Sequence, residues 1–158
     1  MHLKIISIQR HPQKEIQSLE ENYLKRLLSM IQVDLITIRP KTTADEKEKT
    51  LREEEKLIQR ELANDENLVA LDSKGKEFST PELSHLLDKN MKMGTKSLVF
   101  LIGGPQGISE NLMAKAKVRW SLSKLTFPHR LVRLIILEAL YRSMDLLKGG
   151  PYHKALTK

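Results

Sequence analysis

The stretch that decides this fold runs from Leu98-Val-Phe-Leu-Ile102 into Gly103-Gly-Pro-Gln-Gly107. A short apolar run that ends in a glycine-rich turn is typical of a buried strand that brings its backbone close to a ligand. A second loop, which mixes Ser and Thr with apolar residues, follows at Leu122–Phe127, and a long apolar helix pattern begins after it. Two such loops beside a buried helix predict a pocket.

Outward from this stretch, the apolar pattern alternates between the period of a strand and that of a helix. Strands are predicted at Leu3–Ile8, Val33–Ile38, Asn67–Asp72, Leu98–Ile102 and Val118–Leu122. Helices are predicted after Pro12, after a capping box at Thr43–Glu46, at Thr80-Pro81, at Ser109-Glu110 and from Leu131 to Leu147. We therefore expect residues 1–158 to form one α/β domain, with a mostly parallel sheet and helices on both faces.

The carboxyl ends of three predicted strands are candidates for a binding site, because parallel α/β sheets bind ligands there. They are Leu71-Asp72, Gly103-Gly104 and the loop Leu122–Phe127. Consecutive glycines let the backbone approach a ligand closely, and the loop can present backbone groups to an adenine edge. The alternatives are a tight turn made for packing and an ordinary connection between a strand and a helix.

The chain lacks the patterns of several other classes of protein. It has no run of about 18 apolar residues, so no membrane span is expected, and its N-terminus is too mixed for a signal peptide. It contains no cysteine, so we expect no disulfide framework and a cytoplasmic location. The five histidines show no metal-ligand spacing, so no metal site is expected. The glycine turn fits neither the dinucleotide fingerprint nor the Walker loop.

The net charge of +7 is concentrated near one end of the chain. Residues 1–108 carry 17 Lys and Arg against 17 Asp and Glu, whereas residues 109–158 carry 10 against 3. A basic surface beside the predicted pocket suits a polyanionic partner; a basic face without function is the alternative. We expect Arg130 and Arg133 to belong to this surface. The charge-rich helix after Glu46 has balanced signs and is interpreted as a solvated helix.

The last helix pattern is apolar almost all round, as expected for a helix buried on several sides. Glu138, Arg142 and Asp145 lie within it and are expected to face one another or a partner chain, because buried charge is kept only when paired. An exposed apolar helix also suggests a homodimer. The segment from Gly149 to Lys154 has a composition suited to stacking on a base and contacting phosphate, although most termini are frayed.

Four motifs stand in order along the second half of the chain. They are Leu-Ile-Gly-Gly-Pro-Gln-Gly at 101–107, Trp-Ser-Leu-Ser-Lys-Leu-Thr-Phe-Pro-His at 120–129, Leu-Glu-Ala-Leu-Tyr-Arg at 137–142 and Pro-Tyr-His-Lys at 151–154. Together they resemble the RlmH family, the ribosomal large-subunit pseudouridine N3-methyltransferases of the SPOUT superfamily. Two features depart from that family: Gln9-Arg10-His11 replaces a glycine after the first strand, and Ala155–Lys158 extends the tail.

The resemblance implies an α/β-knot fold with a deep trefoil knot in the C-terminal part. It also implies a homodimer that binds S-adenosylmethionine in a bent form among the knotted loops. By position, it implies cofactor contacts from Leu71, Gly103, Leu122, Ser123, Lys124, Leu125, Thr126 and Phe127.

The resemblance further implies that the catalytic residues are His129, Arg142, Tyr152 and His153. The implied substrate is a pseudouridine of 23S rRNA, which is methylated at N3 on the assembled ribosome. We expect His129 or His153 to assist deprotonation of N3, Arg142 to stabilise the developing oxyanion and Tyr152 to orient the base. One alternative is a non-catalytic ribosome-binding or RNA-binding protein of the same fold. Methylation of tRNA or protein is disfavoured, because the chain is too short for an added RNA-binding domain.

Overall fold

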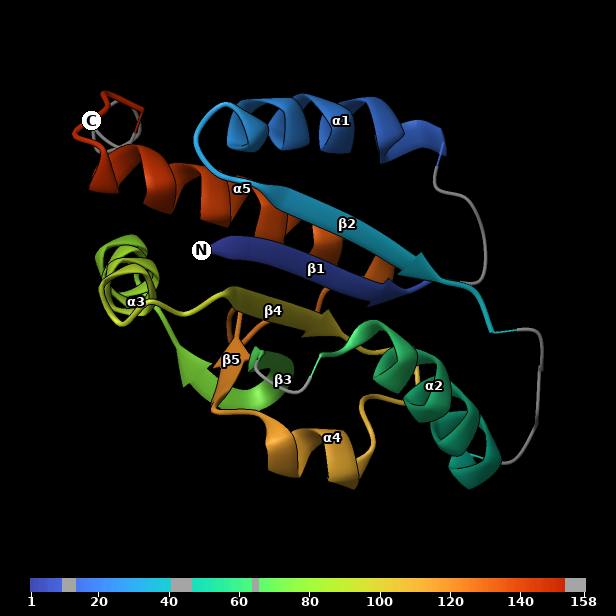
Figure 1. Ribbon diagram of the computed structural model, residues 1–158. Coiled ribbons are helices and arrows are strands. Elements are labelled where there is room, and N and C mark those ends of the chain that lie inside the picture. Colours follow the sequence, from blue (N-terminus) through green and yellow to red (C-terminus); the bar gives the residue numbers. More distant parts are fainter. Residues whose placement is uncertain (10–13, 41–46, 64–65, 153–158) are drawn as a thin grey trace.

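The computed structural model describes residues 1–9, 14–40, 47–63 and 66–152, and it shows one sheet with helices around it (Figure 1). The elements in chain order are β1 His2–Ile8, α1 Lys14–Leu28, β2 Val33–Ile38, α2 Lys47–Glu61, β3 Asn67–Glu77, α3 Thr80–Lys92, β4 Ser97–Ile102, α4 Glu110–Lys115, β5 Val118–Ser121 and α5 His129–Leu147. The predicted capping box at Thr43–Glu46, residues 10 and 11, and the tail after Tyr152 lie outside the described residues.

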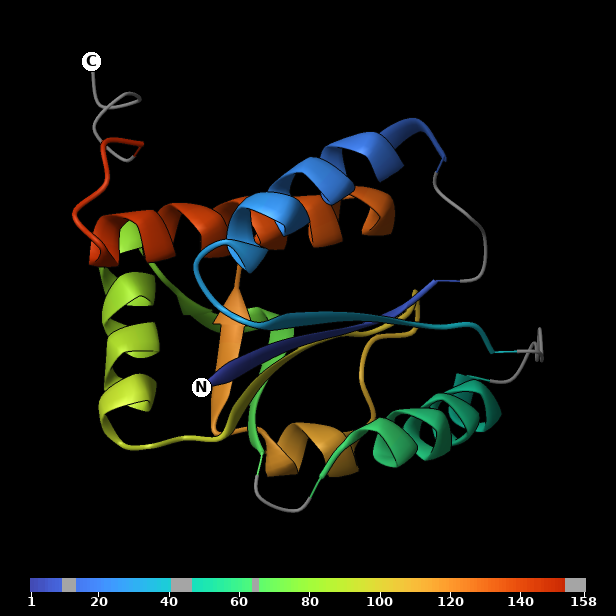
Figure 2. The same ribbon diagram turned by 45° about the horizontal axis from the view of Figure 1, so that its top comes forward.

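The five strands lie in the order β2-β1-β4-β3-β5, and every neighbouring pair is parallel. The predicted α/β class is therefore confirmed. Helices cover both faces, as Figure 2 shows, with α1 and α5 above the sheet and α2 and α4 below it. The predicted trefoil knot is not tested by this strand order and stays a prediction.

Two hydrophobic cores hold the helices to the sheet, one on each face. The first packs α1, α3 and α5 against the sheet through residues such as Leu27, Leu87 and Leu140. The second packs α2 and α4 against the other face through Ile58 and Leu112. Strand β4 lies in the middle of the sheet and is buried along its whole length. This is why its sequence is a continuous apolar run rather than an alternating one.

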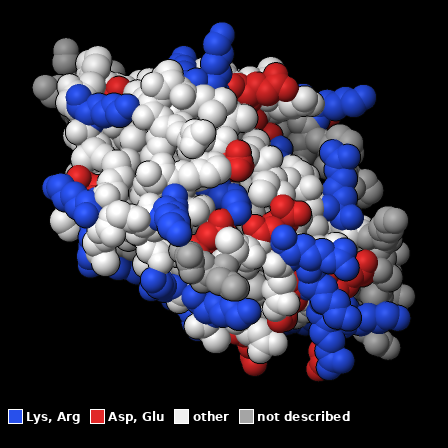
Figure 3. All heavy atoms as spheres, viewed as in Figure 1, with Lys and Arg blue, Asp and Glu red and all other residues white. Residues whose placement is uncertain are grey.

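The charge-rich helix α2 is solvated, as its balanced composition predicts. Over α2, Figure 3 shows Lys and Arg side chains interspersed with Asp and Glu side chains. The buried residues of the helix are Thr50, Glu54 and Ile58, so only a narrow stripe faces the sheet. Because its basic and acidic residues balance, the basic excess of the chain does not come from α2.

Strand β3 is longer than the sequence predicts. We expect it to end at Asp72, but it continues to Glu77 and shifts its register between Leu71 and Lys76, which both pair with Trp120. A shift of this kind bends a strand and pushes the extra residues out of the ladder. Local periodicity cannot show it, because the residues in the bulge resemble an ordinary turn.

Arg133 is buried, so the expectation that it belongs to a basic surface is wrong; the side chain of Arg130 lies outside the described part of the structure. Its guanidinium forms a bidentate ion pair with Glu20 of α1, and its Nη1 donates to Thr37 Oγ1 at 2.8 Å. The side chains of Arg133 and Glu20 are 10% and 3% exposed. The pair therefore joins α5 to α1 and to the end of β2 inside the core.

Breaking this ion pair is expected to cost stability. Glu20→Leu or Arg133→Met alone should lower the free energy of unfolding by about 3–5 kcal/mol, because each leaves one buried charge without a partner. The double variant should recover much of this loss, because no buried charge remains. Urea unfolding of the two single variants and the double variant measures this double-mutant cycle. Glu21→Gln, at an exposed position, is the control, and its free energy of unfolding should lie within about 0.5 kcal/mol of that of the unaltered chain. Single variants that each cost less than about 1 kcal/mol would refute a structural ion pair.

Candidate active site

A cleft of about 1040 Å³ opens at the carboxyl ends of β3, β4 and β5. Its walls come from the bulge of β3, the glycine turn after β4, the loop after β5 and the first turn of α5. The predicted convergence of three strand ends is therefore correct. Pockets of a few hundred to about 1000 Å³ are typical of sites for cofactors and small ligands.

The glycine turn is close-packed and also lines the cleft. Gly107 has φ of +89° and its N–H donates to the carbonyl of Gly104 at 2.9 Å. A Cβ atom on Gly103 would lie 2.4 Å from the carbonyl oxygen of Gly107, and one on Gly104 would lie 2.9 Å from Oε1 of Glu54. Packing and exposure of backbone to a ligand are therefore both reasons for glycine here.

The bulge of β3 forms the facing wall. Asp72 accepts a hydrogen bond from the N–H of Lys74 at 3.0 Å, and both residues line the cleft beside Leu71. Gly75 has no room for a side chain, because a Cβ atom there would lie 2.6 Å from the carbonyl of Arg119. The bulge is thus held against β5 by backbone contact.

The loop after β5 is shaped by its own hydroxyl groups. Ser121 Oγ donates to the carbonyl of Ser123 at 3.1 Å, and Ser123 Oγ accepts from the N–H of Leu125 at the same distance. The apolar side chains remain available to the cleft, and that of Leu125 is 71% exposed. An exposed leucine at the mouth of a cleft offers an apolar contact to a bound ring.

Helix α5 begins at the cleft. Pro128 is its N-cap and makes no side-chain hydrogen bond to the first turn. His129, the first helical residue, is exposed and lines the cleft. The first turn has no acidic side chain, so the positive end of the helix dipole faces this region without a built-in counter-charge.

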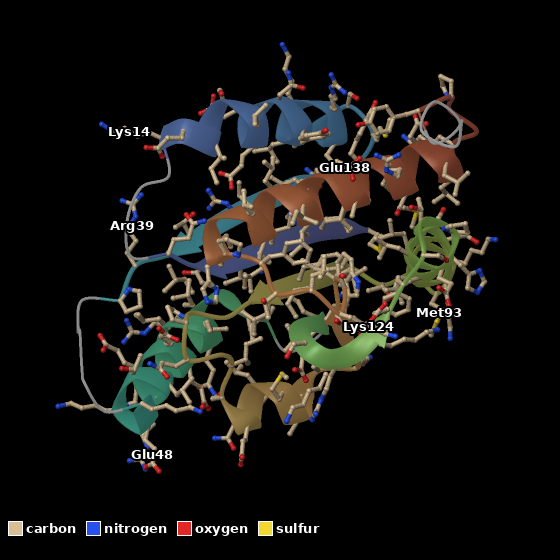
Figure 4. All side chains as sticks on the ribbon, turned by 180° about the vertical axis from the view of Figure 1, so that it is seen from behind. Lys14, Arg39, Glu48, Met93, Lys124 and Glu138 are labelled. Atoms are coloured by element: carbon tan, nitrogen blue, oxygen red, sulfur yellow. The ribbon has the colours of Figure 1, made fainter. Side chains whose placement is uncertain are left out.

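Arg142 and Tyr152 lie elsewhere, in a cluster at the other end of α5. The guanidinium of Arg142 pairs with Glu138 and lies 4.9 Å from the ring centroid of Tyr152. The hydroxyl of Tyr152 is 3.3 Å from that of Tyr23 and donates to Glu138 Oε1 at 3.4 Å. Figure 4 shows Glu138 on the side of α5 that faces α1. At a rise of about 1.5 Å per residue, Arg142 is roughly 20 Å along the helix from His129.

The start of the tail is fixed to α5 by Asp145. Its Oδ2 accepts from the N–H of Tyr152 at 2.9 Å, and its carbonyl accepts from the N–H of Gly150 at 2.8 Å. A Cβ atom on Gly150 would lie 2.1 Å from the Asp145 carboxylate. The expectation that the charges of α5 face one another holds for Glu138 and Arg142, whereas Asp145 instead binds backbone.

The environment of Tyr152 disfavours its ionised form. The hydrogen bond with Tyr23, burial and the negative charge of Glu138 together raise the pKa of Tyr152 to about 12, against a smaller opposing effect of Arg142. The phenol is therefore neutral and able to donate at any physiological pH.

Other kinds of site are not found in the described part of the chain. Among residues 1–9, 14–40, 47–63 and 66–152, no group of three His, Cys, Asp or Glu side chains is placed to hold a metal ion. Within the same ranges, no helix has the length and apolar character needed to cross a membrane.

Comparison with known proteins identifies the family. The family model described as "Predicted SPOUT methyltransferase" matches residues 1–153. The chain belongs to the SPOUT methyltransferase family. Its relatives include proteins named Ribosomal RNA large subunit methyltransferase H. That of Desulfitobacterium hafniense is 36% identical over 160 residues, covering 98% of this chain and 99% of the relative.

Two further relatives of the same name give a similar result. That of Flavobacterium johnsoniae is 41% identical over 155 residues, covering 97% of this chain and 99% of the relative. That of Francisella philomiragia is 39% identical over 156 residues, covering 98% and 100%. The resemblance predicted from the four motifs is therefore confirmed along nearly the whole chain.

Within this SPOUT methyltransferase, the structure divides the predicted site residues into three sets. Those that line the cleft are Leu71, Gly103, Leu122, Ser123, Leu125, Thr126, Phe127 and His129. The side chain of Lys124 is exposed and outside the lining, and Arg142 and Tyr152 lie in the separate cluster. His153 is outside the described residues.

The sequence motifs do not indicate several residues of the cleft and of the cluster around Arg142 and Tyr152. Arg119 and Met113 line the cleft, and only the alternation of β5 gave a signal for Arg119, which is exposed between half-buried Val118 and buried Trp120. Glu138 was predicted only as a paired charge, and Tyr23 only as part of a helix. No local pattern connects Tyr23 to Tyr152, because 129 residues separate them.

The raised pKa of Tyr152 predicts a response to alkaline pH. A tyrosine with a pKa of about 12 when folded and about 10 when unfolded stabilises the fold fully below pH 10, and this effect is lost as the pH rises towards 12. The difference in melting temperature between the unaltered chain and Tyr152→Phe should be constant below about pH 9 and shrink above about pH 10. Thermal melts at a series of pH values measure this difference; one that stays constant to about pH 11.5 would contradict the shift.

Proposed function

We propose that this chain is an S-adenosylmethionine-dependent methyltransferase that methylates N3 of a pseudouridine in 23S rRNA, acting on assembled ribosomes in the cytoplasm. The observation that carries this proposal is the cleft formed by the Gly103 turn and the Leu122–Phe127 loop in a member of the SPOUT family. The names of the relatives supply the class of substrate, ribosomal RNA of the large subunit.

The cleft has the chemical character that S-adenosylmethionine requires. Gly103 and Gly104 expose backbone without side chains, and the loop after β5 offers backbone amides and carbonyls. Leu71, Leu122 and Phe127 provide apolar walls for an adenine ring. Backbone recognition of the base edge with apolar contacts on its faces is the common arrangement of such sites.

The residues of the chain supply orientation and proton transfer. When bound, S-adenosylmethionine supplies an electrophilic methyl group. The cleft must hold the target nitrogen in line with that group, and a base must take the proton of N3 because an imide N–H is a poor nucleophile. His129 lies at the cleft and can take this proton; His153 remains the alternative.

We further propose that a second copy of the chain completes the site. Within one chain, Arg142 lies roughly 20 Å along α5 from His129, and Tyr152 lies beside Arg142. A twofold axis that pairs two α5 helices antiparallel brings the C-terminal half of one beside the N-terminal half of the other. In such a homodimer, Arg142 of one protomer would stabilise the developing oxyanion at the cleft of the other, and Tyr152 would orient the base.

Basic side chains at the mouth of the cleft suit an RNA substrate. Lys47, Lys74 and Arg119 line the cleft, together with the acidic Asp72 and Glu110. Contacts from such side chains to phosphates would position the nucleotide while the cleft reads the base.

Calorimetry with S-adenosylmethionine tests the cofactor. Gly103→Ala should weaken binding about tenfold or more, because the new Cβ displaces the turn from the Gly107 carbonyl. Lys124→Ala, in the adjacent loop, should bind as the unaltered chain does, because its side chain is outside the lining. Circular dichroism checks that both variants are folded. If the unaltered chain did not bind at millimolar cofactor, a non-catalytic RNA-binding protein would be favoured.

Methylation with labelled cofactor tests the reaction and the base. Intact ribosomes should be labelled at a single pseudouridine, and free 23S rRNA much less. His129→Ala and His153→Ala separate the two candidate bases: removal of the true one should slow single-turnover methylation about a hundredfold. If neither variant changed the rate, both base assignments would be wrong.

A further inference from the structure

Helix α1 contributes a tyrosine to the cluster that contains Arg142 and Tyr152, although no sequence motif places it there. The Tyr23 hydroxyl lies 3.3 Å from the Tyr152 hydroxyl. The rings of Tyr23, Tyr141 and Tyr152 form a continuous aromatic cluster through a tilted and an edge-to-face contact, with centroids 6.1 Å and 4.8 Å apart. Arg26 lies over the first two rings, at 5.7 Å and 5.5 Å.

The direction of the hydrogen bonds in this cluster follows from the acceptors. Glu138 Oε1 receives both the guanidinium of Arg142 and, at 3.4 Å, the hydroxyl of Tyr152. Because a carboxylate accepts only, the Tyr152 hydroxyl is the donor in its contact with Glu138. Between the two phenols either hydroxyl can be the donor, and the raised pKa of Tyr152 favours donation by Tyr152, since donation stabilises its neutral form. The Tyr152 proton then lies between two acceptors, the Tyr23 oxygen and Glu138 Oε1, and the same carboxylate also accepts from Arg142.

Each member of this series limits the freedom of the next. Glu138 and the Tyr152 ring fix the guanidinium of Arg142 from two sides, by an ion pair and by a cation–π contact at 4.9 Å. Tyr152 is held in turn by two hydrogen bonds, one from its backbone N–H to Asp145 and one between its hydroxyl and that of Tyr23. Tyr23 comes from α1, which the buried Glu20–Arg133 pair ties to α5. The orientation of Arg142 therefore depends on a helix far away in the sequence.

We propose that Tyr23 is a positioning residue for methyl transfer, which sets the orientation of Arg142 through the Tyr152 hydroxyl and the Glu138 carboxylate. This inference rests on the proposed function, because Arg142 and Tyr152 act at the reacting base only under that proposal. Tyr23 itself touches neither cofactor nor substrate in this view. The competing explanation is that Tyr23 serves only to pack α1 on α5.

Removal of one hydroxyl distinguishes the two explanations. Tyr23→Phe keeps the ring and its aromatic contact but removes the hydroxyl that is hydrogen-bonded to Tyr152. Tyr141→Phe is the matched control: its ring lies in the same aromatic cluster, and within the described residues its hydroxyl makes no hydrogen bond. A packing role predicts similar effects of both variants, whereas a positioning role predicts that only Tyr23→Phe affects catalysis.

The first readout is kinetic. With intact ribosomes and S-adenosylmethionine, Tyr23→Phe should lower kcat about fivefold to tenfold, the effect of one lost hydrogen bond. Its KM for the cofactor should be unchanged, because the cleft is at the other end of α5. Tyr141→Phe should leave both constants unchanged.

The second readout is spectroscopic and does not need activity. The hydrogen bond with Tyr23 is the largest cause of the raised pKa of Tyr152, so Tyr23→Phe should lower that pKa towards about 10. Ultraviolet absorbance titration of phenolate formation measures it, and Tyr152→Phe identifies the signal of Tyr152 by difference. The neighbouring charges that also act on Tyr152, Glu138 and Arg142, are the same in both chains.

The outcomes are separable. An unaltered chain that methylates ribosomes, with a Tyr23→Phe variant of equal kcat, would refute the inference and leave the proposed function intact. An unaltered chain with no activity on ribosomes or free rRNA would refute the proposed function and the inference together. A fall in kcat confined to Tyr23→Phe, together with a lowered Tyr152 pKa, would support the positioning role.

Discussion

The cleft depends on the contact between Gly103 and the backbone of Gly107. A Cβ atom at Gly103 would lie 2.4 Å from the Gly107 carbonyl oxygen, so the chain leaving β4 turns as tightly as it does only without that atom. Because β4 is buried between β1 and β3, the position of the turn is fixed at the carboxyl end of β4, beside the bulge of β3 and the loop after β5. The same absence of side chains that permits the turn exposes its backbone. Packing and recognition are therefore two consequences of one constraint.

Helix α5 links this cleft to a second chemical cluster. Its first residue, His129, lines the cleft, and its last turns carry Arg142 and the acceptor for the tail, Asp145. The helix is positioned from within by Arg133, whose bidentate pair with Glu20 is almost completely buried. A buried ion pair is weak evidence of net stability, since replacement by apolar residues is often neutral. Its directional hydrogen bonds, including that to Thr37, instead fix how α5 is rotated against α1 and β2.

The parts of the fold that were predictable are those whose signal is local. The apolar run of β4, the glycine turn and the starts of α3 and α4 each lie within a few residues, and their prediction was correct. The bulge of β3, the burial of Arg133 and the position of Tyr23 were not predictable in this way. Each depends on pairing between distant segments: Arg133 meets Glu20 across 113 residues. An arginine at a basic end of the chain resembles a surface residue until its acidic partner is located in space.

The separation of the two clusters along α5 has a consequence for how such a small chain could work. Under the proposed function, these 158 residues would supply one cofactor cleft but little further surface with which to enclose a large RNA. If the second cluster acts on the cleft of another protomer, one helix serves two sites, and each site gains a cation and an aromatic ring without any added domain. Under the proposed function, this arrangement would make catalysis conditional on association, because a lone chain holds its Arg142 roughly 20 Å along α5 from its own His129. It also makes the orientation of that arginine matter more, since the donor must be aligned before the two chains meet. The hydrogen bonds that join Tyr23, Tyr152 and Glu138 provide that alignment within each chain, so the part that the proposed homodimer would contribute to its partner is already ordered, and its ordering entropy would not have to be supplied on binding.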